Sequence, residues 1–104
     1  MNNQRKILIT NDDGVKSKGI SALIEMMRPY GDVTVVAPFE AQSGMSAALT
    51  IGKPLRLTEL RSEEGLKIYA CSGTPADCVK MAMNQIYSGI TPNLLVSGIN
   101  HGSN

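Results

Sequence analysis

Two adjacent carboxylates, Asp12 and Asp13, are the part of this sequence best suited to chemistry. They follow a short apolar run from Ile7 to Ile9 and precede Gly14. Because successive strand side chains point to opposite faces, both aspartates can serve one centre only if the chain turns after the strand. Gly14 supplies the backbone freedom for that turn. The pattern predicts a buried parallel strand that delivers two anionic oxygens into a crevice, although Asn-Asp-Asp-Gly is also a common surface turn.

Two further segments place polar groups directly after apolar runs. Ser43 and Gly44 follow the β-branched run 33–37, which predicts a second strand buried on both faces. A hydroxyl followed by glycine can offer an oxygen to a metal and a backbone N–H to an anion, or it can be a plain flexible loop. Residues 100–104 follow the apolar run 94–96, which predicts a third buried strand.

These three polar segments should lie at one end of a parallel sheet, because each of them follows a strand. Together they offer carboxylates, hydroxyls and carboxamides without a thiolate. Oxygen donors of this kind suit hard divalent ions such as Mg²⁺, Mn²⁺ or Ca²⁺. A partly coordinated ion can activate water and polarise a phosphoryl oxygen, and glycine N–H groups can neutralise phosphate. The reaction class that fits is hydrolysis of a phosphate ester.

The first helix is expected between the first two strands. Apolar residues spaced three and four apart predict a helical face over 20–27 that closes at Pro29. The stretch 15–19 before it is expected to be polar and flexible. The order strand, helix, strand indicates an α/β protein with a mostly parallel, Rossmann-like three-layer sheet.

A hairpin and a second helix follow. Alternating apolar residues on both sides of 62–65 predict a short hairpin with one buried and one wet face. Thr74 as N-cap and Pro75 at the first helical position predict a helix start, and the helix should end before Gly89. Its apolar face comprises Val79, Met81, Ala82 and Ile86. The start of this helix can touch a phosphate or can be a cap and nothing more.

Composition bounds the class of protein. The 104 residues allow at most one domain, and 42% hydrophobic residues suffice for a core. A charged fraction of 18%, a net charge of +1 and the absence of Trp argue against a disordered chain and against a nucleic-acid binder. No apolar run approaches the roughly 20 residues that span a bilayer, and the first residues do not resemble a signal peptide. Cys71 and Cys78 are expected to be buried free thiols, so we expect a cytoplasmic protein without membrane contact.

Four motifs resemble the successive motifs of the SurE family, the stationary-phase survival proteins that act as 5'/3'-nucleotidases. They are Ile-Leu-Ile-Thr-Asn-Asp-Asp-Gly, Val-Val-Ala-Pro followed by Gln-Ser-Gly-Met-Ser, Ser-Gly-Thr-Pro-Ala-Asp-Cys-Val, and Ser-Gly-Ile-Asn-His-Gly-Ser-Asn. The resemblance covers essentially the whole chain in the right order. It implies removal of phosphate from nucleoside 5'/3'-monophosphates with one divalent ion, Mg²⁺ or Mn²⁺. It also implies activity on short polyphosphate in some members.

The resemblance also implies site residues. The metal ligands would be Asp12, Asp13, Ser43 and Asn100, with Asp12 and Asp13 catalytic. We assign the following residues to substrate binding: Asn11, Gly44, Thr74, Gly102, Ser103 and Asn104. His101, the only histidine, can donate a proton to the leaving alkoxide, but a solvated loop histidine is the more common case.

Members of the family continue well beyond this point, with further sheet and an extension exchanged between subunits. We therefore expect residues 1–104 to be the N-terminal portion of a single SurE-like domain, incomplete at the C-terminus and weakly active or inactive alone. The full-length protein is expected to be a homodimer or higher oligomer.

Two other functions remain open. Asp12 or Asp13 can act as a nucleophile that forms an aspartyl-phosphate, although the Asp-x-Asp spacing of haloacid-dehalogenase phosphatases is missing. A non-catalytic metal-binding, nucleotide-binding or receiver-like module is the alternative from another class. Receivers need a phospho-acceptor carboxylate after their third parallel strand, where this chain has Ser97-Gly98-Ile99-Asn100.

Overall fold

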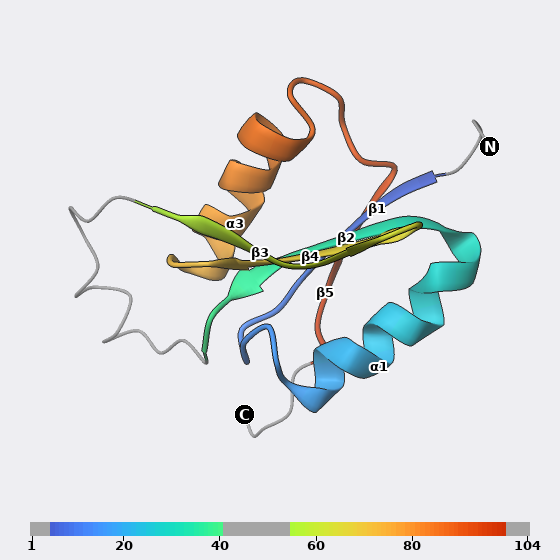
Figure 1. Ribbon diagram of the computed structural model, residues 1–104, viewed down its shortest axis with the longest axis horizontal. Helices are drawn as coiled ribbons and strands as arrows, with labels where there is room; N and C mark the ends of the chain where they lie inside the picture. Colours follow the sequence, from blue (N-terminus) through green and yellow to red (C-terminus); the bar gives the residue numbers. More distant parts are fainter. Residues whose placement is uncertain (1–4, 41–54, 100–104) are drawn as a thin grey trace.

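The computed structural model describes residues 5–40 and 55–99, which form one five-stranded sheet with helices on both faces. The sheet order is β3-β4-β2-β1-β5. The strands are β1 (Arg5–Thr10), β2 (Gly31–Pro38), β3 (Leu57–Glu63), β4 (Leu66–Cys71) and β5 (Leu94–Ser97). The helical segments are α1 (Lys18–Met27), the 3-10 turn η1 (Arg28–Tyr30), α3 (Pro75–Met81) and the π-helical turn η2 (Ala82–Ile86). Figure 1 shows the sheet nearly edge-on, with α1 on one side and α3 on the other.

The strand pairing confirms the predicted α/β class with a mostly parallel sheet. β2 pairs in parallel with β1 and with β4, and β1 also pairs in parallel with β5. Among the described residues, only the β3–β4 pair is antiparallel, and it forms the predicted hairpin. Gly65, in the turn of that hairpin, has a φ of +81°, a conformation that suits glycine.

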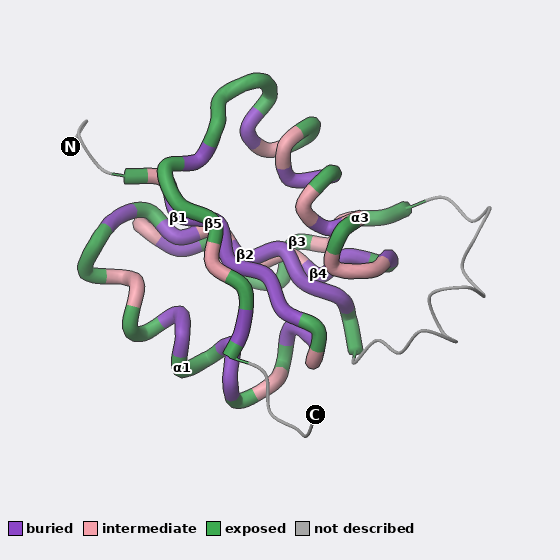
Figure 2. Tube along the Cα trace, turned by 180° about the vertical axis from the view of Figure 1, so that it is seen from behind, coloured by how far each residue is buried: buried purple, intermediate pink, exposed green. Residues whose placement is uncertain are grey.

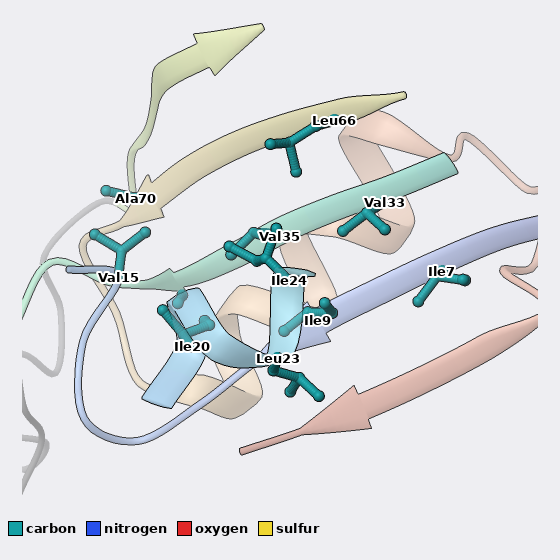
Figure 3. Packing of buried hydrophobic residues seen from close by; sticks show 11 residues of the cluster. Ile7, Ile9, Val15, Ile20, Leu23, Ile24, Val33, Val35, Leu66 and Ala70 are labelled. Atoms are coloured by element: carbon teal, nitrogen blue, oxygen red, sulfur yellow. The ribbon is translucent and has the colours of Figure 1, made fainter. Parts of the chain in front are cut away.

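The α1 face of the sheet carries the larger core (Figure 3). Ile7 and Ile9 of β1 point to this face, as do Val33 and Val35 of β2, because residues two apart share a side. The predicted helical face packs on them through Ile20, Leu23 and Ile24. The helix begins at Lys18, two residues earlier than the apolar spacing indicates, and ends at Met27 before Pro29.

The opposite face packs against α3 and η2. Its core members are Leu8, Val36, Cys71, Cys78, Met81, Ala82 and Tyr87. The predicted face of the second helix is correct for Met81 and Ala82, while Val79 and Ile86 are half-buried. Both cysteines are fully buried and free, as expected. Within the described ranges, no helix has the length and apolar character needed to cross a membrane.

The burial pattern predicted for the hairpin, with one buried and one wet face, is only partly correct for β4 and wrong for β3. In β4, Leu66 and Ala70 lie in the core on the α1 side as predicted. On the other face, however, Cys71 lies in the core on the α3 side and Tyr69 packs against it. Leu60 is 44% exposed, and the pairing register shifts between Glu59 and Arg61. Such an irregularity leaves one residue unpaired and breaks the alternation of side chains. β3 is also an edge strand, so only one neighbour contributes to its burial.

The third predicted strand is present as β5, but its predicted burial is wrong. Leu94 and Leu95 are 45% and 47% exposed although they point to opposite faces of the sheet. β5 lies at the edge beyond β1, and Figure 2 shows its exposed and half-buried residues beside the buried β1. A short apolar run therefore predicted the strand without predicting how many neighbours would cover it.

The docking of α1 can be tested with two substitutions on the same helix. Ile20→Ala removes a fully buried side chain and should lower the free energy of unfolding by about 2–5 kcal/mol. Met26→Ala, at a residue that is 58% exposed, should change it by no more than about 0.5 kcal/mol. Urea unfolding followed by circular dichroism gives both values, and equal losses would contradict the observed orientation of α1.

Candidate active site

The four parallel strands β4, β2, β1 and β5 all end on one side of the sheet, which we call the carboxyl edge. Backbone hydrogen bonds join the chain there: Val15 N–H to Pro38 O (2.8 Å), Phe39 N–H to Cys71 O (3.2 Å) and Gly98 N–H to Thr10 O (3.0 Å). In Figure 1 the turn after β1, the end of β2 and the end of β5 lie on this side. The carboxyl edge therefore gathers segments that are far apart in the sequence.

Asn11, the first residue after β1, organises the turn that carries the two aspartates. Its side chain is fully buried. The Oδ1 atom accepts a hydrogen bond from the Gly14 N–H (3.3 Å), and Nδ2 donates to the Gly14 carbonyl oxygen (2.9 Å). The same Nδ2 donates to the Ser17 hydroxyl over 3.0 Å. Gly14 has a φ of +108°, so the tight turn depends on glycine at this position.

Ser17 connects this turn to α1. Its hydroxyl caps the helix by accepting a hydrogen bond from the Ile20 N–H over 3.3 Å. Val15 is only 7% exposed and belongs to the core on the α1 face. The expectation of a merely polar and flexible stretch over 15–19 is therefore wrong. The signal was present in the sequence as a serine three residues before the first apolar helical residue.

The turn presents Asp12 as an exposed side chain and Asp13 as a half-buried one. Two consecutive carboxylates on a fixed turn are suitable oxygen ligands for a hard divalent ion. In the described part of the chain, no three His, Cys, Asp or Glu side chains gather closely enough to hold a metal. Asp12 and Asp13 thus fit part of such a site, and its other donors would have to come from elsewhere.

Thr74 begins α3 as predicted and forms a capping box with Asp77. The Thr74 hydroxyl accepts from the Asp77 N–H (3.2 Å), while the Asp77 carboxylate accepts from the Thr74 N–H (3.0 Å). The Thr74 hydroxyl also lies 3.0 Å from the same carboxylate. These groups are engaged with one another in this structure, which fits the capping role. Contact of Thr74 with a phosphate stays a prediction.

The two buried thiols lie where β4 leads into α3. A hydrogen bond from Cys78 lowers the pKa of Cys71 to about 7, and burial opposes this effect. The Gly73 N–H, 3.4 Å from the Cys71 sulfur, also favours its thiolate. The same thiol pairing, followed by burial, raises the pKa of Cys78. The sulfur atoms of Cys71 and Met81 are 3.8 Å apart, so sulfur contacts tie the end of β4 to α3.

Six predicted site residues lie outside the described residues: Ser43, Gly44, Asn100, Gly102, Ser103 and Asn104. His101 also lies outside them. Residues 39–40 and 98–99, which immediately follow β2 and β5, are described and lie at the carboxyl edge. Of the predicted residues, the structure thus brings Asn11, Asp12 and Asp13 together on one turn after β1. It places Thr74 after β4, which is separated from β1 by β2.

Comparison with known proteins identifies the family. The family model described as "Survival protein SurE" matches residues 7–104. The chain belongs to the SurE family. The resemblance to this family seen in the sequence is therefore confirmed.

Individual SurE proteins show how much of the family this chain represents. It is 50% identical over 99 residues to the 5'-nucleotidase SurE of Porphyromonas gingivalis, covering 95% of this chain and 39% of that protein. It is 56% identical over 98 residues to the 5'-nucleotidase SurE of Cytophaga hutchinsonii, covering 94% and 38%. The crystal structure of the SurE protein from Aquifex aeolicus matches with a TM-score of 0.76 and 40% identity, covering 94% and 38%. The chain thus spans about two fifths of the length of these relatives.

The role of Asn11 in the turn that carries Asp12 and Asp13 can be tested by substitution. Asn11→Ala removes three hydrogen bonds and leaves the Gly14 N–H unpaired, while the Gly14 carbonyl keeps its bond from the Ser17 N–H, so the free energy of unfolding should fall by about 1–3 kcal/mol. Ser17→Ala, which removes the cap but leaves the bonds to Gly14 possible, should cost about 1 kcal/mol. Urea unfolding measures both changes, and a smaller loss for Asn11→Ala than for Ser17→Ala would contradict the central role of Asn11.

Proposed function

We propose that the protein containing this chain is a metal-dependent phosphomonoesterase that removes phosphate from nucleoside 5'/3'-monophosphates. The observation that carries the proposal is the buried Asn11 carboxamide, which holds Asp12 and Asp13 on a fixed turn at the carboxyl edge. This is the edge at which open α/β sheets bind ligands. Support also comes from SurE relatives that are named 5'-nucleotidases and are about half identical to this chain.

The donor chemistry suits one divalent ion, Mg²⁺ or Mn²⁺. Asp12 and Asp13 would hold it, together with Ser43 and Asn100 from the segments that follow β2 and β5. All four residues offer oxygen, which hard ions prefer over nitrogen and sulfur. When bound, such an ion lowers the pKa of a coordinated water and polarises a phosphoryl oxygen.

The residues of the chain itself would orient the reaction. Asp12 and Asp13 sit on a turn fixed at both ends, by β1 before it and by the Ser17 cap after it. Carboxylates that are already held in place do not need to reorganise during the reaction. Preorganisation of this kind lowers the activation free energy. Gly44 and the segment 102–104 would bind the phosphate, and Thr74 would lie beside it.

We also propose a second substrate, an oligomeric state, a cellular location and a proton donor for this phosphatase. Short polyphosphate is proposed as a second substrate, because it presents the same terminal phosphate. We propose a homodimer or higher oligomer at full length and a cytoplasmic location, with no nucleic-acid or membrane partner. His101 is the candidate proton donor to the leaving alkoxide, since it neighbours the proposed ligand Asn100.

Substitution of the aspartates tests this function in the full-length protein. Asp12→Asn and Asp13→Asn should each lower kcat/KM for adenosine monophosphate about 100-fold or more, because each loses an anionic ligand. Asp32→Asn, on β2 near its amino end, should leave the rate unchanged. Phosphate release is the measurement, and a chelator should abolish it until Mg²⁺ or Mn²⁺ is restored.

Three results would contradict the proposal. Unchanged rates in both aspartate variants would remove Asp12 and Asp13 from the site. A trapped phosphoenzyme on either aspartate would replace the activated water by a nucleophilic carboxylate. Metal or nucleotide binding by the full-length protein without any phosphate release would favour a receiver-like binding module.

A further inference from the structure

Two buried side-chain oxygens in the described part of the chain make no hydrogen bond: Thr10 Oγ1 and Tyr87 Oη. Thr10 is 4% exposed and Tyr87 is 7% exposed. A buried hydroxyl without a partner loses its bonds to water and gains none in return, so it opposes folding. Each such group calls for an explanation, and their positions in the fold differ.

Thr10 lies at the candidate active site. It is the last residue of β1 and directly precedes Asn11. By the alternation of a strand it shares a face with Leu8, which packs on the α3 side. Its register partner on β5 is the exposed Ser97, and its carbonyl oxygen accepts from the Gly98 N–H over 3.0 Å. The unpaired hydroxyl therefore lies at the carboxyl edge, at the start of residues 11–14, the turn that carries Asp12 and Asp13 and that we call the acidic turn.

The nearby polar groups of the turn already have partners. The Asn11 carboxamide bonds to Gly14 and Ser17, and the Thr10 carbonyl bonds to Gly98. Packing alone would favour valine at position 10, because valine has nearly the same shape, suits strands and carries no hydroxyl. A hydroxyl retained at such a position is explained if its acceptor arrives with a ligand.

We propose that the Thr10 hydroxyl is a further substrate-binding group, which donates a hydrogen bond to a phosphate oxygen at the carboxyl edge. This inference rests on the proposed phosphatase function. The hydroxyl is already stripped of water before the ligand binds, so a bond to an anionic oxygen there meets little competition from solvent. A phosphate oxygen is also the strongest kind of acceptor that the proposed substrate offers.

Tyr87 supplies a matched control at the opposite end of the sheet. It lines a cavity of about 720 Å³ together with residues at the amino ends of the strands, including Lys6, Gly31 and Leu66. Burial raises the pKa of its phenol, and the neighbouring Thr34 hydroxyl opposes that rise without reaching hydrogen-bonding geometry. Tyr87→Phe thus removes the other unpaired hydroxyl, which lies near Asp32 at the opposite end of the sheet from Asp12 and Asp13.

The test compares Thr10→Val, Thr10→Ser and Tyr87→Phe in the full-length protein, with inorganic phosphate as the probe in the presence of Mn²⁺. In the absence of phosphate, Thr10→Val and Tyr87→Phe should leave the melting temperature unchanged or raise it, because each removes an unpaired hydroxyl. Thr10→Val should weaken phosphate binding and raise KM for adenosine monophosphate, each by about tenfold or more. Thr10→Ser and Tyr87→Phe should bind phosphate within about threefold of the unaltered protein.

Each contrary result has a distinct meaning. Equal phosphate binding by Thr10→Val and the unaltered protein would overturn the role of Thr10 and leave the proposed function standing. A clear fall in melting temperature for Thr10→Val, restored in Thr10→Ser, would show a partner within the fold and overturn the role as well. Failure of the unaltered protein both to bind phosphate and to release it from nucleotides would overturn this inference and the proposed function together.

Discussion

The buried carboxamide of Asn11 is the constraint on which the candidate site depends. A carboxamide can donate and accept at once, and here it satisfies both backbone groups of Gly14 and reaches the hydroxyl of Ser17. An ionised aspartate at this position could accept a hydrogen bond but could not donate one. The turn can therefore project two carboxylates outward because its own polar groups are satisfied inward. Because Asn11 is buried, water could not replace any of these hydrogen bonds if it were lost, so each of them is needed for stability.

The same interaction couples the site to the larger core. The Ser17 hydroxyl oxygen accepts a hydrogen bond from Asn11 Nδ2 and another from the Ile20 N–H in the first turn of α1. One hydroxyl therefore stabilises both the acidic turn and the helix. α1 is in turn fixed by Ile20, Leu23 and Ile24 on the sheet. Packing on one face of the sheet thus determines where the two aspartates lie. The other face contributes through β4 and α3, whose junction is held by the Cys71 and Cys78 thiols and by the Thr74 capping box.

The elements with strong local signals could be predicted from sequence, and the features that depend on neighbours could not. The spacing of Ile20, Leu23 and Ile24 predicts α1 because it matches the helical period. The continuous run 33–37 predicts β2 because such runs are typical of strands buried on both faces. The exposure of Leu94 depends on its strand lying at a sheet edge, which a short apolar run does not encode. Likewise, the residue types in the acidic turn predict a site, but they do not reveal that the Asn11 side chain turns inward. The roles of Ser43 and Asn100 stay predictions, because both residues lie outside the described ranges.

The pairing of β1 with β5 has a consequence for how the protein forms during synthesis. β1 is the first strand and β5 the last of those described, and Lys6 and Asn93, which bond to each other at the start of this pair, are separated by 87 positions. Contacts between such distant segments form slowly, because the chain must lose the entropy of closing a long loop before these contacts can stabilise the fold. β2 can pair with β1 as soon as it leaves the ribosome, whereas the other side of β1 stays open until β5 follows. We therefore expect the hydrogen bond from Gly98 to Thr10, beside the turn that carries Asp12 and Asp13, to form after the α1 core.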